Sequence, residues 1–427
     1  MSLPNDMLQA GMKGYPHGHA AMRCADVAQR GWNVLAGDLP LPLAVLKREA
    51  LEHNLAWMQR QTTSWGLSLA PHGKTSMSPQ LFTRQLAAGA WGMTFATVTQ
   101  LAVGVQGGVR RALIANQVAG DADLAGIQRL LVQHAGLRVV FLVDSLAQLA
   151  LIEDWVQRHP DCLTFEVMLE VGVPGGRTGC RSHVDALAVA QALHACPAVH
   201  LVGIECYEGL GAQGRDDTDV PYAQALMSRV QAVATHCAEQ GWFDGDEVLL
   251  SAGGSAIFDL VAPGLKLALS KPVRGLLRSG CYVTHDHGHY RRLVNVVEQR
   301  LGCAANSSLQ PALEVWTLVQ SYPEPGLALL TAGRRDVSFD VALPTPIARA
   351  KRGSLQTQAV PASWQITALN DQHAYLRWSE ADAAQAPQVG ERVGLGISHP
   401  CTTFDKWQWM PIVEADYRVS DAVRIFF

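Results

Sequence analysis

Hydrophobic and polar positions along the middle of the chain follow two alternating patterns. Short runs rich in Val, Ile, Leu and Phe are typical of buried strands, and longer stretches between them carry apolar residues at helical spacing. The expected strands are residues 67–70, 92–97, 112–115, 138–143, 164–170, 199–206, 247–251 and 273–277. The expected helices are residues 47–61, 79–90, 98–105, 121–134, 146–158, 184–196 and 222–240.

Eight strands that alternate with amphipathic helices predict an α/β protein built on a (β/α)8 TIM-type barrel, whose usual length is about 250 residues. A doubly wound sheet is the alternative. The number of strands favours the barrel, and so do the glycine and polar residues at the end of strand after strand. A barrel carries its functional residues at the carboxyl ends of its strands, so this rim is where we look for chemistry.

The pattern changes after about residue 290. Short strand-like runs at 314–320, 327–331, 365–369, 374–377, 392–395 and 409–413 are divided by Pro and Gly turns, which predicts a β-rich second domain. We therefore expect three regions: an N-terminal arm over 1–40 with some helix at 20–32, a barrel over 41–290, and the β-rich domain over 291–427.

Composition limits the classes of partner. The net charge of the 427-residue chain is only −4, so nothing indicates a nucleic-acid surface. No apolar run is long enough to cross a bilayer, and no export signal is evident at the N-terminus, so we expect no membrane partner. Nine cysteines without a close pair or a secreted-scaffold spacing are typical of reduced thiols, which indicates the cytoplasm.

Lys74 follows the first of the eight strands, in the segment Leu-Ala-Pro-His-Gly-Lys-Thr at 69–75. Pro71 and Gly73 keep a helix from beginning at once, so the amine is expected at the mouth of the barrel. A buried lysine there has a lowered pKa and can act as nucleophile and base, as a Schiff-base lysine must. A solvated loop lysine is the alternative for this segment taken alone.

Two further rim segments bring an arginine and a tyrosine. Arg177 lies in the glycine-rich loop 172–179, where the absence of side-chain bulk lets an anionic group approach its cationic fork. Tyr207 ends the sixth strand at the same rim. A flexible surface turn and a packing tyrosine are the plainer interpretations of these two residues.

The loops after the seventh and eighth strands combine glycines with small hydroxyl residues. The residues that we assign to a phosphate cup there are Ser251, Gly253, Gly254, Ser255, Gly280, Cys281 and Tyr282. In a barrel these loops are the usual phosphate site, because backbone amides freed by glycine point at the oxygens. Together with Lys74 and the arginine loop they imply a phosphorylated aldehyde joined to the lysine, and pyridoxal 5′-phosphate is the candidate.

Two histidine-containing segments resemble metal sites. His399 and Cys401 stand two residues apart in the β-rich domain, so in an extended segment both face one side and can bind one cation, zinc first, with magnesium or manganese as alternatives. A buried cysteine beside a structural histidine is the plainer interpretation. The triplet His285, His287 and His289 raises the alternative of a metal-dependent hydrolase, which leaves Lys74 unexplained.

The residues also match a known family. The chain from about residue 41 to 427 resembles the fold-type III pyridoxal-phosphate enzymes of the alanine racemase class, in the branch of the D-serine dehydratases and D-threonine aldolases. The matching stretches are Pro71-His72-x-Lys74-Thr75, Gly176-Arg177-Thr178-Gly179, Tyr207-Glu208-Gly209, Ser251-x-Gly253-Gly254-Ser255, Gly280-x-Tyr282, Pro323-Glu324-Pro325-Gly326 and His399-x-Cys401. The resemblance implies that Lys74 carries the cofactor, with His72 beside it as a second catalytic candidate. Arg177 would then face the cofactor phenolate, Tyr207 would line its ring, and the two glycine loops would hold its phosphate.

The resemblance also implies an activity. In this branch a His-x-Cys pair accompanies zinc-dependent dehydratases and a His-x-Asp pair accompanies aldolases, so Cys401 favours a D-serine dehydratase, or a related dehydratase of D-3-hydroxy amino acids. The alternatives are a D-threonine or 3-hydroxy-D-aspartate aldolase, an amino-acid racemase, and a non-catalytic pyridoxal-phosphate carrier. The resemblance further implies a homodimer with shared active sites.

Overall fold

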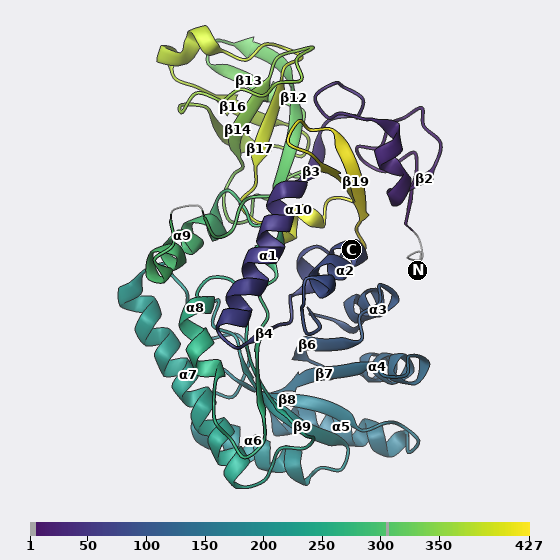
Figure 1. Ribbon diagram of the computed structural model, residues 1–427, viewed down its shortest axis with the longest axis vertical. Helices are drawn as coiled ribbons and strands as arrows, with labels where there is room; N and C mark the ends of the chain where they lie inside the picture. Colours follow the sequence, from purple (N-terminus) through teal and green to yellow (C-terminus); the bar gives the residue numbers. More distant parts are fainter. Residues whose placement is uncertain (1–5, 305–306) are drawn as a thin grey trace.

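The computed structural model describes residues 6–304 and 307–427. In Figure 1 an α/β barrel forms one end of the molecule and a β-rich part forms the other. All nine cysteines lie within the described ranges as free thiols. None of the helices in those ranges has both the length and the apolar character needed to cross a bilayer.

Eight parallel strands form the barrel. They are β4 (Ser68–Leu69), β5 (Met93–Phe95), β6 (Arg111–Gln117), β7 (Arg138–Val143), β8 (Phe165–Val171), β9 (Val199–Cys206), β10 (Val248–Ala252) and β11 (Val273–Leu277), paired in the order β4-β11-β10-β9-β8-β7-β6-β5. A bridge between His72 and Thr94 links the two end strands, and the amide of Trp91 donates a 2.7 Å hydrogen bond to the carbonyl of Leu69. The predicted barrel with a β-rich second domain is confirmed.

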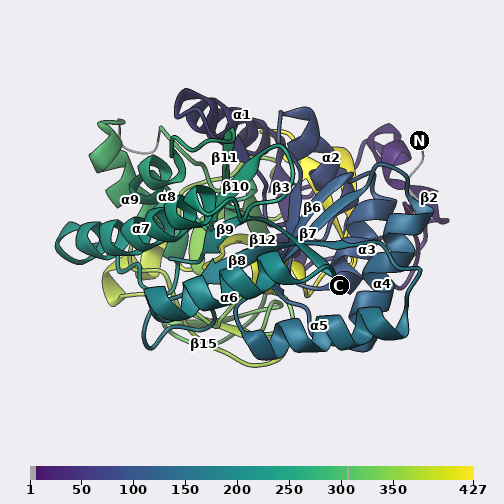
Figure 2. The ribbon, with the colours of Figure 1, turned by 90° about the horizontal axis from the view of Figure 1, so that it is seen from below.

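Helices surround these strands, as the view from below shows (Figure 2). They are α1 (Arg48–Ser64), α2 (Pro79–Ala87), α3 (Val98–Gln106), α4 (Asp121–Gln133), α5 (Leu146–Arg158), α6 (His183–Ala195), α7 (Asp216–Glu239), α8 (Phe258–Val261) and α9 (His289–Leu301). The side chains of Thr97, Ser145 and Ser182 cap α3, α5 and α6 by accepting a hydrogen bond from the amide three residues on. Each such cap stabilises its helix by about 1 kcal/mol.

Strand β7 shows why the barrel strands are continuous apolar runs. Val140 and Leu142 belong to the small core inside the barrel, whereas Val139, Phe141 and Val143 belong to the larger core outside it. All five side chains are buried. A parallel strand covered on both faces needs apolar residues at every position, which is the pattern of the sequence.

The second part is a sheet assembly in which one strand comes from far earlier in the chain. Its strands are β3 (Leu43–Lys47), β12 (Leu313–Glu324), β13 (Leu327–Leu330), β14 (Thr345–Ala350), β15 (Gln365–Leu369), β16 (Ala374–Arg377), β17 (Arg392–Gly396), β18 (Trp409–Val413) and β19 (Val419–Arg424). Strand β3 pairs with β12 and β18, although its residues fall in the range 41–290 that we expect for the barrel. After the N-terminal arm the chain thus passes through the second sheet as β3 and enters the barrel through α1.

The N-terminal arm packs on this second sheet. Its described part holds the hairpin β1 (Met7–Leu8) and β2 (Met22–Arg23), followed by a 3-10 helix at Cys24–Arg30, where the sequence predicts helix at 20–32. Residues 1–5 of the predicted arm lie outside the described ranges. The indole of Trp409 donates a hydrogen bond of 2.9 Å to the carbonyl of Lys13, which ties the arm to β18.

Candidate functional site

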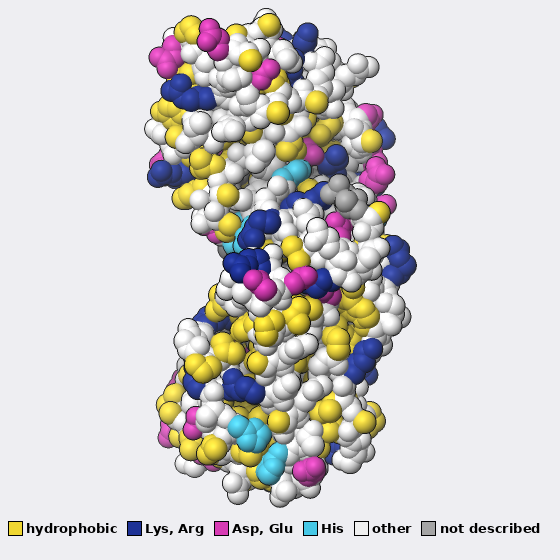
Figure 3. All heavy atoms as spheres, turned by 90° about the vertical axis from the view of Figure 1, so that its left-hand side faces the viewer, with side chains coloured by type: hydrophobic (Ala, Val, Ile, Leu, Met, Phe, Trp, Pro, Cys, Tyr) yellow, Lys and Arg dark blue, Asp and Glu magenta, His cyan; other side chains and the backbone are white. Residues whose placement is uncertain are grey.

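A cavity of about 290 Å³ lies where the carboxyl ends of the barrel strands meet the second part of the chain. The predicted residues that line it are His72, Lys74, Arg177, Tyr207, Gly253, Ser255, Gly280, Cys281, His399 and Cys401. On the face drawn in Figure 3 the surface narrows at this junction, with Lys, Arg and His side chains beside the hollow. One chain therefore brings the lysine and the predicted metal pair into a single cavity.

Lys74 lies in a single 3-10 turn, Gly73–Thr75, directly after β4. Burial lowers the pKa of its amine, Arg177 lowers it further, and Cys401 opposes the shift. A Cβ atom on Gly73 would lie 2.6 Å from the ring of Phe95, so glycine is what lets the turn pack so closely. The sequence thus places an amine with a lowered pKa at the strand end, as a nucleophile or base requires.

Arg177 and Tyr207 contact each other across the rim. The guanidinium carbon of Arg177 lies 4.8 Å from the centre of the Tyr207 ring, a cation–π arrangement. Burial raises the pKa of the Tyr207 phenol, so its hydroxyl keeps its proton at neutral pH. A second hollow, of about 500 Å³, lies along the glycine-rich loop and shares both residues.

The predicted phosphate cup is only partly free to bind an anion. The amides of Gly253 and Gly254 donate hydrogen bonds to the buried carboxylate of Glu208, the first of them at 2.9 Å. By contrast, the amides of Ser255 and Gly280 have no acceptor within the described ranges. These two amides fit a phosphate, whereas the assignment of Gly253 and Gly254 stays a prediction.

Three predicted cup residues do not line the cavity. The hydroxyl of Ser251 donates to the carbonyl of Leu276 at 3.1 Å and accepts from Arg278 at 2.6 Å. The phenol of Tyr282 accepts a hydrogen bond from Gln85 at 3.2 Å. Gly254 completes the turn in the left-handed region, with φ of 64°. These residues hold the loops in place and are not themselves exposed to the cavity.

Substituting Gly280 by Ala tests the close packing of the cup. A Cβ atom at this position would lie 2.7 Å from both the carbonyl oxygen of His72 and the hydroxyl of Thr75. We expect a cost of about 1–3 kcal/mol in unfolding free energy and weaker retention of pyridoxal phosphate, measured by urea unfolding and by dialysis. Gly18→Ala is the control, because no atom lies within 4 Å of its added Cβ. Equal behaviour of the two variants would contradict this account of the loop.

A buried arginine–glutamate pair that no sequence pattern indicated lies at the floor of the cavity. The guanidinium of Arg278 contacts the carboxylate of Glu205 at 2.7 Å, and both side chains are almost fully buried. Burial raises the pKa of Glu205 to about 8, Arg278 limits that rise, and the nearby Glu170 and Glu208 add to it. The Nε atom of Arg278 and the Nδ1 atom of His72 have no partner in the described ranges, so polar groups remain free at this floor.

The pKa of Glu205 predicts a pH-dependent stability. The folded state binds this proton more tightly than the unfolded chain, whose pKa is near 4.5, so the stabilisation is fully present at low pH and is lost as pH rises through about 8. We expect Glu205→Gln to remove that decline between pH 5 and pH 8.5, measured by urea unfolding at both values. The exposed Glu380→Gln variant is the control and should keep the wild-type slope.

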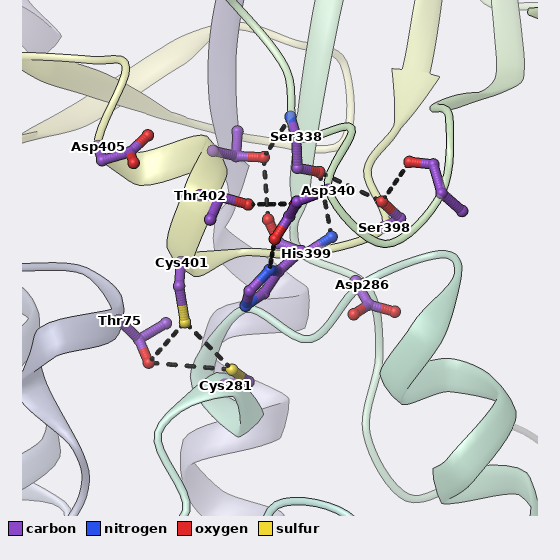
Figure 4. Close-up of polar contacts among 12 residues, drawn as sticks. Thr75, Cys281, Asp286, Ser338, Asp340, Ser398, His399, Cys401, Thr402 and Asp405 are labelled. Atoms are coloured by element: carbon purple, nitrogen blue, oxygen red, sulfur yellow. Dashed lines mark hydrogen bonds and ion pairs between the residues drawn. The ribbon is translucent and has the colours of Figure 1, made fainter. Parts of the chain in front are cut away.

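His399 lies in the loop between β17 and the short helix α10 (Cys401–Phe404), and Cys401 is the first residue of that helix, so the pair does not lie in the extended segment that the sequence predicts. Figure 4 shows their surroundings. The Nδ1 atom of His399 lies 2.6 Å from a carboxylate oxygen of Asp340, whose other oxygen accepts a hydrogen bond from Thr402 at 2.7 Å. Such a carboxylate fixes the orientation of a metal-binding imidazole and leaves the Nε2 atom to bind the metal. The residues present therefore fit a metal ion, with Asp340 as a partner that the sequence analysis missed.

The predicted pair is not part of a finished metal cluster. Within residues 6–304 and 307–427, no group of three or more His, Cys, Asp and Glu side chains is already arranged to hold a metal ion. The histidine triplet does not form one either. Burial lowers the pKa of His285 to about 3 and that of His287 to about 4, so both rings stay neutral inside the protein. Neutral imidazoles can bind a metal, so it is the lack of a third donor around them in the described ranges that does not support the hydrolase alternative.

Comparison with known proteins agrees with the geometry. Residues 46–271 match the family described as "Alanine racemase, N-terminal domain", and residues 312–413 match "Putative serine dehydratase domain". A D-threonine aldolase of Arthrobacter sp is 27% identical, over 87% of this chain and 88% of the relative. The D-threo-3-hydroxyaspartate dehydratase of Delftia sp. (strain HT23) is 26% identical, over 91% and 97%.

Solved structures show the same fold. The D-threonine aldolase of Filomicrobium marinum superposes with a TM-score of 0.75 at 22% identity, covering 92% of this chain and 96% of that one. The Delftia dehydratase gives 0.70 at 24% identity, covering 91% and 98%. The first family match spans more than half of the 427 residues. The chain therefore belongs to the alanine racemase N-terminal domain family, within the fold-type III class of pyridoxal-phosphate enzymes.

Proposed function

We propose that the protein is a pyridoxal-phosphate- and metal-dependent lyase that eliminates water from a D-amino acid with a 3-hydroxyl group. Hydrolysis of the eliminated product takes up one water and releases ammonia and a 2-oxo acid, so the net loss is ammonia. D-serine, which would yield pyruvate, is the first candidate. The observation that carries the proposal is that Lys74 and the pair His399 and Cys401 line the same cavity of one chain. A base for the Cα proton and ligands for a metal at the 3-hydroxyl are what this elimination needs.

The relatives support the class of reaction. One of them is named a dehydratase of a D-3-hydroxy amino acid and another an aldolase of one, and both match most of this chain. A solved structure of a D-threo-3-hydroxyaspartate dehydratase is described as a metal-free form of a mutant, which supports a metal in this branch. Cys401, in the His-x-Cys pattern, favours dehydration over aldol cleavage.

Two bound groups would supply the chemistry that side chains lack. Pyridoxal phosphate, when bound, supplies an aldehyde for the substrate amine and an electron sink for the charge left on Cα, and a divalent metal supplies a Lewis acid. Lys74 would hold the aldehyde, and the amides of Ser255 and Gly280 would hold the phosphate. His399 and Cys401 would hold the metal.

The side chains of this protein would perform the proton transfer and the positioning. Because burial lowers the pKa of the Lys74 amine, a larger share of it is unprotonated and can take the Cα proton at its Nζ atom. Arg177 stacked on Tyr207 limits how far either side chain can turn at the rim. The buried Arg278–Glu205 pair keeps polar groups fixed at the floor, where water is largely excluded.

Product analysis tests the proposal. Purified protein is incubated separately with D-serine, D-threonine and D-threo-3-hydroxyaspartate, and with the L-enantiomers as controls. We expect ammonia and a 2-oxo acid from a D-substrate and no turnover of the L-forms. Glycine together with an aldehyde would instead identify an aldolase, the second candidate, which the 27% identical D-threonine aldolase favours. Inversion without a cleaved product would identify a racemase, and no reaction with any amino acid would favour a carrier.

The homodimer stays a prediction. The second part of this chain closes its own barrel mouth, because Cys401 lies 3.4 Å from the hydroxyl of Thr75 beside Lys74. A partner subunit would therefore add to an existing cavity. Light scattering on the purified protein checks this, with a mass near twice 46.1 kDa expected for the dimer.

A further inference from the structure

We propose that Cys281 is a third protein ligand of the metal, so that the site consists of two thiolates and one imidazole. This inference rests on the metal part of the proposed function and adds a ligand to it. Cys281 begins the short 3-10 helix Cys281–Val283, which residues 278–280 separate from the end of β11, in the loop that would hold the cofactor phosphate. Cys401 begins α10 in the second part of the chain.

The distance between the two sulfur atoms is the first observation. The Sγ atoms of Cys281 and Cys401 are 3.6 Å apart, and both residues line the cavity. Two sulfurs bound to one zinc ion, each about 2.3 Å from it at a tetrahedral angle, lie roughly 3.8 Å apart. The pair is thus spaced as one edge of a zinc tetrahedron, without movement of the backbone.

The second observation is that a third polar atom, the hydroxyl oxygen of Thr75, contacts both sulfur atoms. The hydroxyl oxygen of Thr75 lies 3.4 Å from the sulfur of Cys401 and 3.9 Å from that of Cys281, so the three atoms form a triangle with nearly equal edges. Figure 4 shows this triangle beside the ring of His399. Cys281 is buried and Cys401 is half-buried, but each sulfur contacts another polar atom at the cavity wall.

The donor set explains what the third ligand would do. Asp340 occupies Nδ1 of His399, so Nε2 is the nitrogen left for a metal. Two thiolates and one imidazole leave a fourth position open, which is the arrangement of catalytic zinc sites. The described residues do not hold a finished three-donor cluster, so a side-chain rotation accompanies metal entry. Soft sulfur donors select zinc over magnesium or manganese.

The proposal has a mechanical consequence. Gly280 and Cys281 are neighbours, so a metal held by Cys281 and Cys401 would tie the cofactor loop of the barrel to the second part of the chain. Metal loss would then remove the catalytic ion and would also loosen the cofactor loop. Both thiols must lose their protons when the metal binds, so proton release accompanies loading.

X-ray absorption at the zinc edge tests the ligand count on the zinc-loaded holoenzyme. We expect two sulfur neighbours per zinc in the wild type, one in Cys281→Ser and one in Cys401→Ser. Chelator competition should show that Cys281→Ser lowers the zinc affinity by at least tens of fold. Loss of a residue that only supports a ligand already lowers metal affinity by about 10–100-fold, so loss of a direct ligand should cost at least as much. Cys162→Ser, on the loop between α5 and β8 away from the cavity, is the control and should keep two sulfurs.

Different outcomes separate this inference from the proposed function. One sulfur neighbour in the wild type, or an unchanged count in Cys281→Ser, overturns the role of Cys281 and leaves a two-ligand metal site standing. A disulfide between Cys281 and Cys401 in the zinc-loaded protein, found by alkylation and mass spectrometry, overturns it as well. No zinc neighbour from either cysteine overturns the metal part of the proposed function itself.

Discussion

Replacing Lys74 by Ala is expected to abolish turnover and the visible absorbance that lysine-bound pyridoxal phosphate gives the protein. The side chain lies in the cavity after β4, and burial lowers the pKa of its amine. Loss of a positioned general base alone costs about 10²–10⁴-fold in rate, and Lys74 is also the nucleophile that would hold the aldehyde. Absorption spectra and steady-state rates with the best D-substrate measure both effects.

Lys74→Arg is the matched variant, because it keeps a positive charge and a long side chain but its guanidinium stays protonated. We expect it to be as inactive and as colourless as Lys74→Ala, since an amine that can lose a proton is what both roles need. Retained colour with full turnover in either variant would remove Lys74 from the proposed mechanism. A folded, colourless Lys74→Ala protein with normal thermal unfolding would exclude simple misfolding as the cause.

Removal of the metal ligands is expected to have the second-largest effect. Cys401→Ala and His399→Ala should each bind the metal more weakly and lose on the order of 100-fold or more in turnover, because a Lewis acid contributes several kcal/mol at a leaving oxygen. With pyridoxal phosphate in excess, the absorbance that reports cofactor binding at Lys74 should remain. Metal analysis by plasma mass spectrometry and rates before and after chelator treatment check this result.

Asp340→Asn is expected to have a smaller effect of the same kind as removal of a metal ligand. Its carboxylate contacts the Nδ1 atom of His399 at 2.6 Å and supports the ring without lying in the lining of the cavity. We expect metal affinity to fall about 10–100-fold, with activity restored by excess metal in this variant but not in His399→Ala. Chelator-resistant turnover in the Cys401→Ala variant would instead rule out the metal step.

Local sequence patterns predicted much of the fold and the lysine of the site. The eight strands could be found because a parallel strand buried on both faces must be apolar at each position, as in β7. Lys74 could be found because a strand end, Pro71 and Gly73 are all encoded within a few residues of it. The glycine loops after β10 and β11 were predicted for the same local reason.

The buried polar partners were harder to predict from sequence. Glu205 and Arg278 each stand at a strand end, which is a weak signal, but their 2.7 Å contact depends on β9 and β11 lying on either side of β10. Glu208 illustrates a different difficulty. A glycine loop shows that amides are available, but it does not show that a carboxylate of the protein has already bound two of them.

The sequence by itself determined the barrel, its rim and the amine at its mouth, because each depends on periodicity or on residues adjacent in the chain. Tertiary structure decided the rest of the site. It placed β3 in the second sheet, brought Cys401 within 3.6 Å of Cys281 across 120 residues of chain, and set Asp340 against His399. Such contacts follow from how the barrel and the second sheet pack together, and no local pattern of apolar and polar residues encodes that packing.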